Sequence, residues 1–485
     1  MTRLSRLCYV PLLVLAATLG GCACEWCAAD EPPAAETDPL VLQKLETFQN
    51  WKFGLMICWG PYSQWGCIES WPLVEEDKWA RHDDLPAWIE RGKDMERFAA
   101  DYVKLNETFN PRHFDPQAWA DAAKRAGMKY VVFTTKHHDG FCMFDTNQTD
   151  YRTTHPSCPF HSDPRADVTK AVFDAFRQTG FGIGAYYSKS DWHHPGYWDP
   201  ARPHPTRNPN YDTAKEPERW AGFMKFTYNI IEEIVSRYGP IDILWLDGGQ
   251  VRPPQQDINM SAIANMARKH QPGLIIVDRT VGGRYENYRT PEQEVPPKAL
   301  PEIWETCMTM GDSWSYKPND NYKAPRQLIH LLVDIAAKGG NLLLNIGPDA
   351  DGRLPKPAIE RLEAIGRWMK INGEAIYGTR AVAPYKVGRV CLTKKGSTVY
   401  LIYLADTNES APPARLLVPA ITGGKAVRML GAETSVDSTF DKERGLTIKL
   451  PESIRQNLPC QHAWAFAVTE AKAADGKFSL PSATP

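Results

Sequence analysis

The stretch "PERWAGFMKFTYNIIEEIVSRYGPIDILWLD", residues 217–247, contains one complete unit of the pattern that decides the fold. An amphipathic run ends near Gly239, and the apolar run from Ile241 then predicts a strand that is buried on both faces. Glycine directly after a helix fits the left-handed position that commonly ends helices. A helix followed at once by a buried strand predicts one unit of a parallel sheet.

The same unit recurs along most of the chain, from about Trp51 to Asn372. Four further copies are residues 115–135, 167–188, 261–279 and 325–348, and the runs "FGLMICW" and "EIWETCM" add two strands. About seven strands over some 320 residues, without a G-x-G-x-x-G motif, favour a closed barrel over an open doubly wound sheet. The sequence therefore predicts the α/β class, with a (β/α)8-like TIM barrel that has one irregular strand.

The pattern changes near Arg380, where short strands between turn residues predict a small C-terminal antiparallel β-sandwich. We divide the chain into a lipoprotein-type signal peptide (1–21), a Pro- and acid-rich tether (22–45), the barrel (46–380), the sandwich (381–472) and a loose tail (473–485). The Pro-rich segment 193–217 follows a strand and is expected to overhang the site of a barrel.

The N-terminus predicts export. Arg3 and Arg6 precede "YVPLLVLAATL", which is too short to span a bilayer as a stable helix. The following "LGGC" resembles a bacterial lipobox, in which Cys22 becomes the lipidated first residue. A soluble secreted protein cut near "ACEWCAA" is the alternative. We expect an exported bacterial protein, periplasmic or extracellular, that meets the membrane only through a lipid anchor at Cys22.

Composition narrows the classes of partner. The net charge of −2 argues against a nucleic-acid partner. Sixteen Trp suit sugar binding as well as core packing. Export permits disulfides among the 11 Cys, but spacing fixes no pairing and gives no zinc pattern of two Cys pairs. Nothing in the sequence indicates the oligomeric state.

In a barrel, the carboxyl ends of the strands form the site. These ends are "CWGPYSQW" (58–65), "TTKHHDGF" (134–141), "YYSKSDW" (186–192), "WLDGG" (245–249), "VDR" (277–279) and "WETC" (304–307). Six polar or aromatic ends together predict a shared pocket. A carboxylate such as Asp247 at the end of a core strand needs a cation, hydrogen bonds or a chemical role; a helix N-cap or a plain salt bridge is the alternative.

The pair His137-His138 allows three interpretations. Adjacent strand residues point to opposite faces, so the pair can chelate one metal ion only where the strand has already ended. No H-E-x-x-H accompanies them. A structural or solvent-facing pair is the second interpretation, and polar contacts to a substrate, which we favour, are the third. We predict neither a metal ion nor a cofactor.

Several stretches resemble, in order, the motif series of the α-L-fucosidases of glycoside hydrolase family 29. They are "FGLMICWGPYSQWG", "KYVVFTTKHHDGF", "IGAYYSKSDW", "IDILWLDGG", "WETCMTMGDSWSY", "GGNLLLNIGPDADGRLP" and "INGEAIYG", between about residues 50 and 380. The resemblance implies a retaining exo-glycosidase on a (β/α)8-like barrel with a β-sandwich behind it. It also implies that no cofactor is needed and that the substrate is a fucosylated glycan or polysaccharide.

By this resemblance Asp247 is the catalytic nucleophile, and a carboxylate at a strand end can indeed attack an anomeric carbon. The general acid/base is assigned through "RTPEQEVP", which matches a recurring "TPE" segment and indicates Glu292. Glu294, Glu305 and Glu286 remain rivals. Whichever residue it is must be protonated at the working pH.

The resemblance also implies the residues that line the sugar: His137, His138, Tyr186, Trp71 and Arg279, together with Glu69, which lies one residue from its usual spacing. Cys58 stands where the family usually has a histidine, and a thiol is a weaker hydrogen-bonding group. The alternatives are therefore a glycosidase of the same fold for another or modified terminal sugar, a non-catalytic sugar-binding lipoprotein, and a metal-dependent barrel hydrolase, which lacks ligand spacing.

Overall fold

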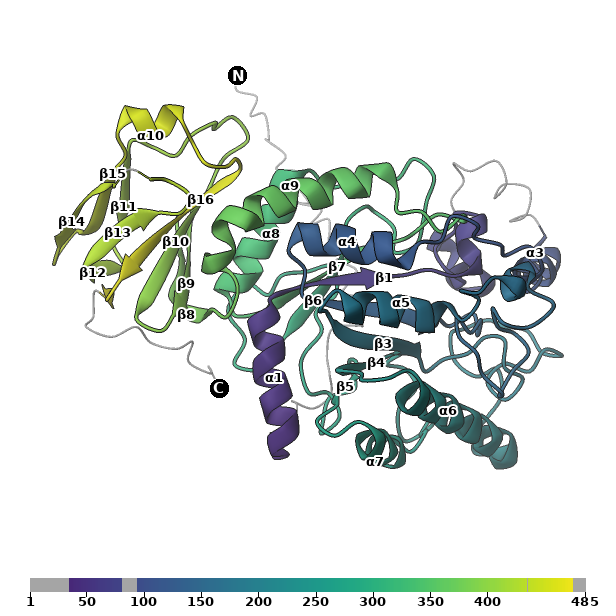
Figure 1. Ribbon diagram of the computed structural model, residues 1–485. Helices are drawn as coiled ribbons and strands as arrows, with labels where there is room; N and C mark the ends of the chain where they lie inside the picture. Colours follow the sequence, from purple (N-terminus) through teal and green to yellow (C-terminus); the bar gives the residue numbers. More distant parts are fainter. Residues whose placement is uncertain (1–34, 81–93, 434, 474–485) are drawn as a thin grey trace, which may run out of the picture.

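The computed structural model describes residues 35–80, 94–433 and 435–473. The expected signal peptide, Cys22 and the tail beyond residue 473 lie outside the described residues. Within the described ranges, no helix is long and apolar enough to cross a membrane. The chain forms a barrel with a smaller β-domain beside it (Figure 1).

Seven parallel strands form the wall of the barrel. They are β1 (Phe53–Ile57), β2 (Tyr130–Lys136), β3 (Gly182–Ser188), β4 (Ile243–Asp247), β5 (Ile275–Asp278), β6 (Glu305–Thr309) and β7 (Asn341–Ile346). Their order is β5-β4-β3-β2-β1-β7-β6. Almost every strand residue is buried, because helices cover the outer face and side chains fill the interior. The predicted α/β barrel is confirmed.

Helices wrap the outside of this sheet (Figure 1). They are α4 (Pro116–Ala126), α5 (Val168–Gln178), α6 (Pro217–Arg237), α7 (Met260–His270), α8 (Pro325–Ala337) and α9 (Lys356–Asn372). Helix α3 (Met95–Tyr102) instead packs through Phe98 and Tyr102 with the loop after β1, beyond the carboxyl ends of the strands (Figure 1). The predicted caps are present: Asp115 accepts from Ala118 N at the start of α4, and Gly127 ends that helix with φ at 89°. Helix α4 therefore ends shortly before β2 begins at Tyr130.

The irregular strand is the segment 286–293, which closes the barrel between β5 and β6. An antiparallel bridge joins Val277 to Glu286, and parallel bridges join Arg289 to Trp304 and Glu292 to Cys307. The segment thus carries Glu292 up to the carboxyl end of the barrel.

Helix α1 (Pro39–Trp51) differs from the sequence prediction, which placed residues 39–45 in the tether. Asp38 caps the helix by accepting from Leu40 N. Val41, Leu45 and Phe48 lie on one face and pack with interior strand residues such as Ile243, so the helix closes the amino end of the barrel. Burial of this apolar face accounts for the difference.

The predicted antiparallel sandwich is also confirmed. Its five-stranded sheet has the order β13 (Ala426–Met429), β16 (Ala463–Thr469), β10 (Thr398–Leu404), β9 (Val390–Lys395), β8 (Arg380–Val387). Facing it are β11 (Arg415–Val418), β15 (Gly445–Lys449) and β14 (Asp437–Asp441), with the pair β12 (Ile421–Gly423) and β17 (Lys472–Ala473) and the short helix α10 (Glu452–Gln456).

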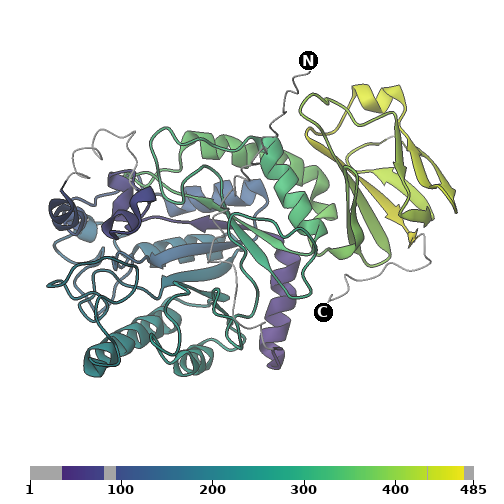
Figure 2. The same ribbon diagram turned by 180° about the vertical axis from the view of Figure 1, so that it is seen from behind.

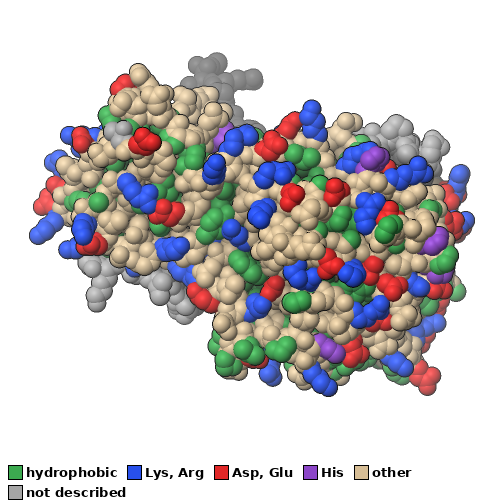
Figure 3. Space-filling view, viewed as in Figure 1, with side chains coloured by type: hydrophobic (Ala, Val, Ile, Leu, Met, Phe, Trp, Pro, Cys, Tyr) green, Lys and Arg blue, Asp and Glu red, His purple; other side chains and the backbone are tan. Residues whose placement is uncertain are grey.

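The five-stranded sheet lies against α8 and α9 of the barrel (Figure 2). Trp368 on α9 donates its Nε1–H to the carbonyl oxygen of Ala463 at 2.8 Å. On the face shown in Figure 3, basic and acidic side chains are interspersed over both parts.

Candidate active site

A cavity of about 450 Å³ opens at the carboxyl end of the barrel strands. All nine side chains that the sequence indicated line it: Cys58, Glu69, Trp71, His137, His138, Tyr186, Asp247, Arg279 and Glu292. The cavity is also lined by Met56, Trp79, Ser188, Ser190, Arg207, Trp245, Gly248, Gln250, Gln293, Cys307 and Trp314. Of these additional residues, Arg207 lies in the Pro-rich segment 193–217 that the sequence placed over the site, whereas Trp79 lies in the short 3-10 helix Lys78–Ala80, where sequence reasoning had no signal.

Asp247 ends β4 and is held by two charged or polar neighbours. Arg279 donates from Nη1 to Oδ1 at 2.9 Å, and the Tyr186 hydroxyl donates to Oδ2 at 2.8 Å. Burial raises the pKa of the Asp247 carboxyl, but the charge of Arg279 and the Tyr186 hydrogen bond outweigh it, so the pKa lies below its usual value. The carboxylate at the strand end is therefore satisfied by an ion pair and stays ionised.

Arg279, which follows β5, joins Asp247 to Glu292. Its Nη2 forms an ion pair with Oε2 of Glu292, while its Nη1 contacts Asp247. One guanidinium thus contacts both carboxylates, and its fork geometry fixes how they face each other. The Glu292 side chain is 39% exposed, so it lies at the open side of the pair.

The three rival glutamates lie elsewhere. Glu305 is buried beneath the cavity, where its carboxylate accepts hydrogen bonds from Tyr130 at 2.6 Å, Trp245 at 3.2 Å and Tyr288 at 3.2 Å. Burial raises its pKa to about 7. Glu286 accepts from Gly282 N at 2.7 Å, and Glu294 is exposed. None of the three lines the cavity, so the geometry favours Glu292.

The two histidines follow the last residue of β2 and both line the cavity. Because the strand has ended, their rings lie close together, with centroids 4.0 Å apart. His138 Nδ1 meets the Ser70 hydroxyl, whereas His137 Nδ1 and His138 Nε2 have no partner among the described residues. Burial lowers the pKa of His137 to about 3 and that of His138 well below its usual value, so both rings are neutral.

A metal role for the histidine pair gains no support. The described part of the chain contains no group of three or more His, Cys, Asp or Glu side chains placed to hold a metal ion. Neutral imidazoles with a free nitrogen in a cavity instead suit hydrogen bonds to an uncharged polar ligand.

Glu69 and Cys58 form a second polar corner. Glu69 is 1% exposed, and burial raises its pKa to about 8, so its carboxyl is protonated at neutral pH. Its Oε2 has no partner within the described ranges. The Cys58 thiol contacts Glu69 Oε1 at 3.6 Å and the Tyr62 hydroxyl at 3.5 Å, and burial raises its pKa well above the usual value. This corner offers neutral hydrogen-bonding groups.

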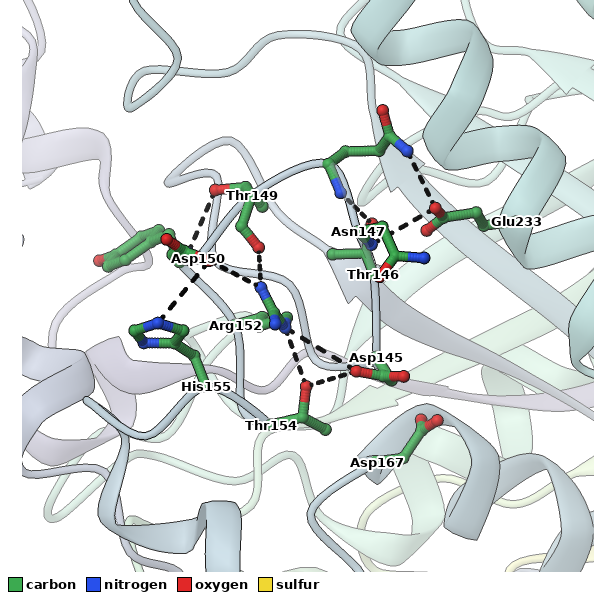
Figure 4. Close-up of polar contacts among 12 residues, drawn as sticks. Asp145, Thr146, Asn147, Thr149, Asp150, Arg152, Thr154, His155, Asp167 and Glu233 are labelled. Atoms are coloured by element: carbon green, nitrogen blue, oxygen red, sulfur yellow. Dashed lines mark hydrogen bonds and ion pairs between the residues drawn. The ribbon is translucent and has the colours of Figure 1, made fainter.

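The loop after the histidines is held by a polar network (Figure 4). Arg152 Nε donates to Thr154 at 3.0 Å, and Thr154 donates to Asp145 at 2.8 Å. Gln148 donates to Glu233 on α6 at 3.0 Å. These contacts tie the loop to the outer helices and thereby support the position of His137 and His138.

The family model described as alpha-L-fucosidase matches residues 24–374, well over half of the chain. The chain belongs to the α-L-fucosidase family. The resemblance noted in the sequence is thereby confirmed, and the members named below are glycoside hydrolases.

Relatives cover nearly the whole chain. Human plasma alpha-L-fucosidase is 29% identical over 445 residues, which are 87% of this chain and 89% of that protein. The structure of alpha-L-fucosidase isoenzyme 1 from Paenibacillus thiaminolyticus is 31% identical, with a TM-score of 0.72 over 89% of this chain and 99% of the other. A Thermotoga maritima alpha-fucosidase solved in complex with fucose is 26% identical, with a TM-score of 0.70 over 87% of this chain and 96% of the other.

Proposed function

We propose that this member of the family is a retaining exo-α-L-fucosidase that removes terminal α-L-fucosyl residues from glycans. The observation that carries the proposal is the contact of one guanidinium, Arg279, with two carboxylates, Asp247 and Glu292, in a cavity. Retaining glycosidases place their two carboxyl groups about 5–5.5 Å apart, and a shared arginine keeps such a pair close.

Each carboxylate has a role that follows from its surroundings. Asp247 is ionised and fixed from two sides, so it can attack the anomeric carbon and form a glycosyl ester. Glu292 lies at the open side of the pair, so it is placed to give a proton to the departing oxygen. The same group then removes a proton from the water that hydrolyses the ester, which restores Asp247 with net retention.

The resting ion pair between Arg279 and Glu292 must open before Glu292 can act as an acid. A substrate entering the cavity comes between the two groups, while Arg279 keeps its second contact to Asp247. Arg279 therefore keeps Asp247 ionised until it attacks the anomeric carbon, and stabilises it again as the leaving carboxylate when the ester is hydrolysed.

The free polar atoms of the cavity fit a neutral sugar. His137 Nδ1, His138 Nε2 and Glu69 Oε2 are buried without partners among the described residues, and each can pair with a sugar hydroxyl. Two Thermotoga maritima structures, 26% and 27% identical to this chain, are described as complexes with fucose and with a mechanism based inhibitor. Both support the proposal.

The test removes the nucleophile. We expect Asp247→Ala to abolish hydrolysis of an aryl α-L-fucoside, and added azide to restore cleavage with release of the fucosyl azide of inverted configuration. The matched control is Asp437→Ala, an exposed aspartate in the sandwich, which should retain full activity. Wild-type activity in Asp247→Ala would contradict the assignment.

A second candidate function is favoured by one residue. The Cys58 thiol faces Glu69 where the family usually has a histidine, so this corner can suit another or a modified terminal sugar. A panel of aryl glycosides tested with the wild type and Cys58→His separates the two. If fucose is the substrate, Cys58→His keeps or raises fucosidase activity. A collapse of activity in a folded variant, with another glycoside preferred by the wild type, would favour the second candidate.

We also propose that the protein is exported and anchored by lipid on Cys22, on the evidence of "LGGC" alone. The wild type should then partition with membranes, and Cys22→Ala should carry no lipid. Mature wild-type protein cut after another residue, without lipid on Cys22, would contradict this.

A further inference from the structure

A continuous row of aromatic rings runs along the cavity wall. In order the rings are those of Trp245, Tyr186, His137, His138, Trp71 and Trp79, with neighbouring centroids 5.2, 5.2, 4.0, 4.5 and 5.9 Å apart. The first five rings lie in the inner part of the cavity, which we assign to the fucosyl unit. Trp79 is the ring at the other end of the row.

Trp79 is the most exposed ring of this row, which places it at the mouth. Tyr186 and Trp245 are each 1% exposed and His138 is 3% exposed, whereas Trp79 is 55% exposed. Trp79 nevertheless lines the same cavity. It is the one large aromatic side chain that is exposed within the described residues, and it continues the row of rings that lines the cavity.

The exposed indole is held in a fixed position. Its Nε1–H donates to Oδ1 of Asp77 at 2.8 Å, and Asp77 is only 2% exposed. Arg207 donates from Nε to Oδ2 of the same carboxylate at 2.8 Å, and its guanidinium lies 4.5 Å from the Trp71 ring centroid. Asp77 therefore links the two tryptophans through one buried ion pair.

Two loops that are distant in sequence form this mouth. Glu75 N donates to the carbonyl of His204 at 3.2 Å, and Glu76 N donates to that of Pro205 at 3.1 Å. The Pro-rich segment after β3 thus reaches the cavity, as the sequence predicted, and it fixes the loop that carries Trp79. Binding on a ring already fixed costs little conformational entropy.

We propose that Trp79 stacks on the sugar ring to which the fucosyl unit is attached, and so selects glycans over small fucosides. This inference rests on the proposed function. In an exo-glycosidase the terminal sugar fills the inner cavity, so the next ring leaves through the mouth, where the face of Trp79 lies one ring further out than Trp71. A pyranose presents a face of C–H groups that packs on an indole, and Trp combines a large apolar face with little loss of rotamer freedom.

The experiment compares two substrates that differ only beyond the cleaved bond. The first is a fucosylated disaccharide, and the second is α-L-fucosyl fluoride, which has no second ring. We expect Trp79→Ala to lower the ratio of kcat/KM on the disaccharide to kcat/KM on the fluoride about tenfold, which is the effect of one lost stacking contact. Trp79→Phe keeps an aromatic face and should retain most of the ratio. Val103→Ala, which removes an exposed apolar side chain away from the cavity, should leave the ratio unchanged.

Each result decides the question. An unchanged ratio in Trp79→Ala, or an equal loss on both substrates, would overturn the inference while the proposed function stands. A wild type that cleaves neither compound would overturn the proposed function, and the inference would fall with it.

Discussion

At the scale of single residues, Arg279 decides the electrostatics of the site. It contacts Asp247 and Glu292 at once, and its own pKa is raised well above the usual value because nearby carboxylates outweigh the effect of burial. Two carboxylates at such close range would repel each other without a cation between them. The arginine therefore allows both to be present in one cavity.

Replacing Arg279 by a neutral residue should change the pH dependence of kcat/KM. The acid limb of kcat/KM reports ionisation of Asp247 in the free enzyme. Arg279→Gln leaves the effect of burial, which raises the pKa, and removes the largest opposing interaction. We expect the acid limb to move to higher pH and the maximal kcat/KM to fall roughly 100-fold. Arg279→Lys keeps a charge and should move the limb less. If the acid limb of Arg279→Gln lies at the same pH as that of the wild type, the role given to Arg279 is contradicted.

Substrates with different leaving groups test the assignment of Glu292 as the general acid/base. Glu292→Ala should lower kcat/KM roughly 10³-fold on a fucosylated disaccharide but much less on a dinitrophenyl fucoside, which needs no proton to depart. Azide should attack the slowly hydrolysed ester in place of water and release the fucosyl azide with net retention. Glu305→Gln preserves the shape of a carboxyl that lies beneath the cavity and should keep most of the activity. The reverse result, with loss in Glu305→Gln and full activity in Glu292→Ala on the disaccharide, would exclude Glu292 as the acid.

At the scale of elements, local sequence predicted the barrel strands well, because most of them are short apolar runs that follow a glycine, such as Gly127 before β2 or Gly239 before β4. Helix α1 was missed because its apolar face is short and follows a Pro-rich stretch. The strand ends contained six of the nine proposed site residues, and the family resemblance added Glu69, Trp71 and Glu292, whereas the contacts that form the mouth were not predictable. Asp77 and Arg207 are 130 positions apart, and their ion pair depends on how two irregular loops fold over the barrel.

Two glycines inside helices should respond in opposite ways to the same substitution. A Cβ on Gly366 of α9 would lie 2.2 Å from the carbonyl oxygen of Arg125, where α4 and α9 pack together, whereas a Cβ on Gly222 of α6 would meet nothing within 4 Å. We expect Gly366→Ala to lower the free energy of unfolding by about 2 kcal/mol through overpacking. Gly222→Ala should raise it by up to about 1 kcal/mol through helix propensity.

Chemical denaturation measures both changes. Equal effects of the two substitutions would mean that helix propensity, rather than the close approach of α4 and α9, decides the response at these positions.

At the scale of the whole molecule, the barrel and the sandwich share a core through strand β16. Its residues alternate, with Ala463, Ala465 and Ala467 in the barrel's hydrophobic cluster and larger neighbours such as Trp464 and Phe466 inside the sandwich. The small side chains let α8 and α9 approach the sheet closely. The sandwich therefore acts as part of the wall that supports the barrel.

This shared core predicts that damage in the sandwich reaches the active site. Ala465→Arg places an unpaired charge in the dry interface and should lower the free energy of unfolding by about 3 kcal/mol or more. Fucosidase activity should then be lost at a lower temperature, although residue 465 does not line the cavity. Ala426→Arg, on an exposed position of the same sheet, should change stability by no more than about 0.5 kcal/mol. In Ala465→Arg the sandwich could instead unfold at a lower temperature while activity survives to the wild-type temperature. That result would mean that the two parts do not share a core and that the barrel is stable without the sandwich.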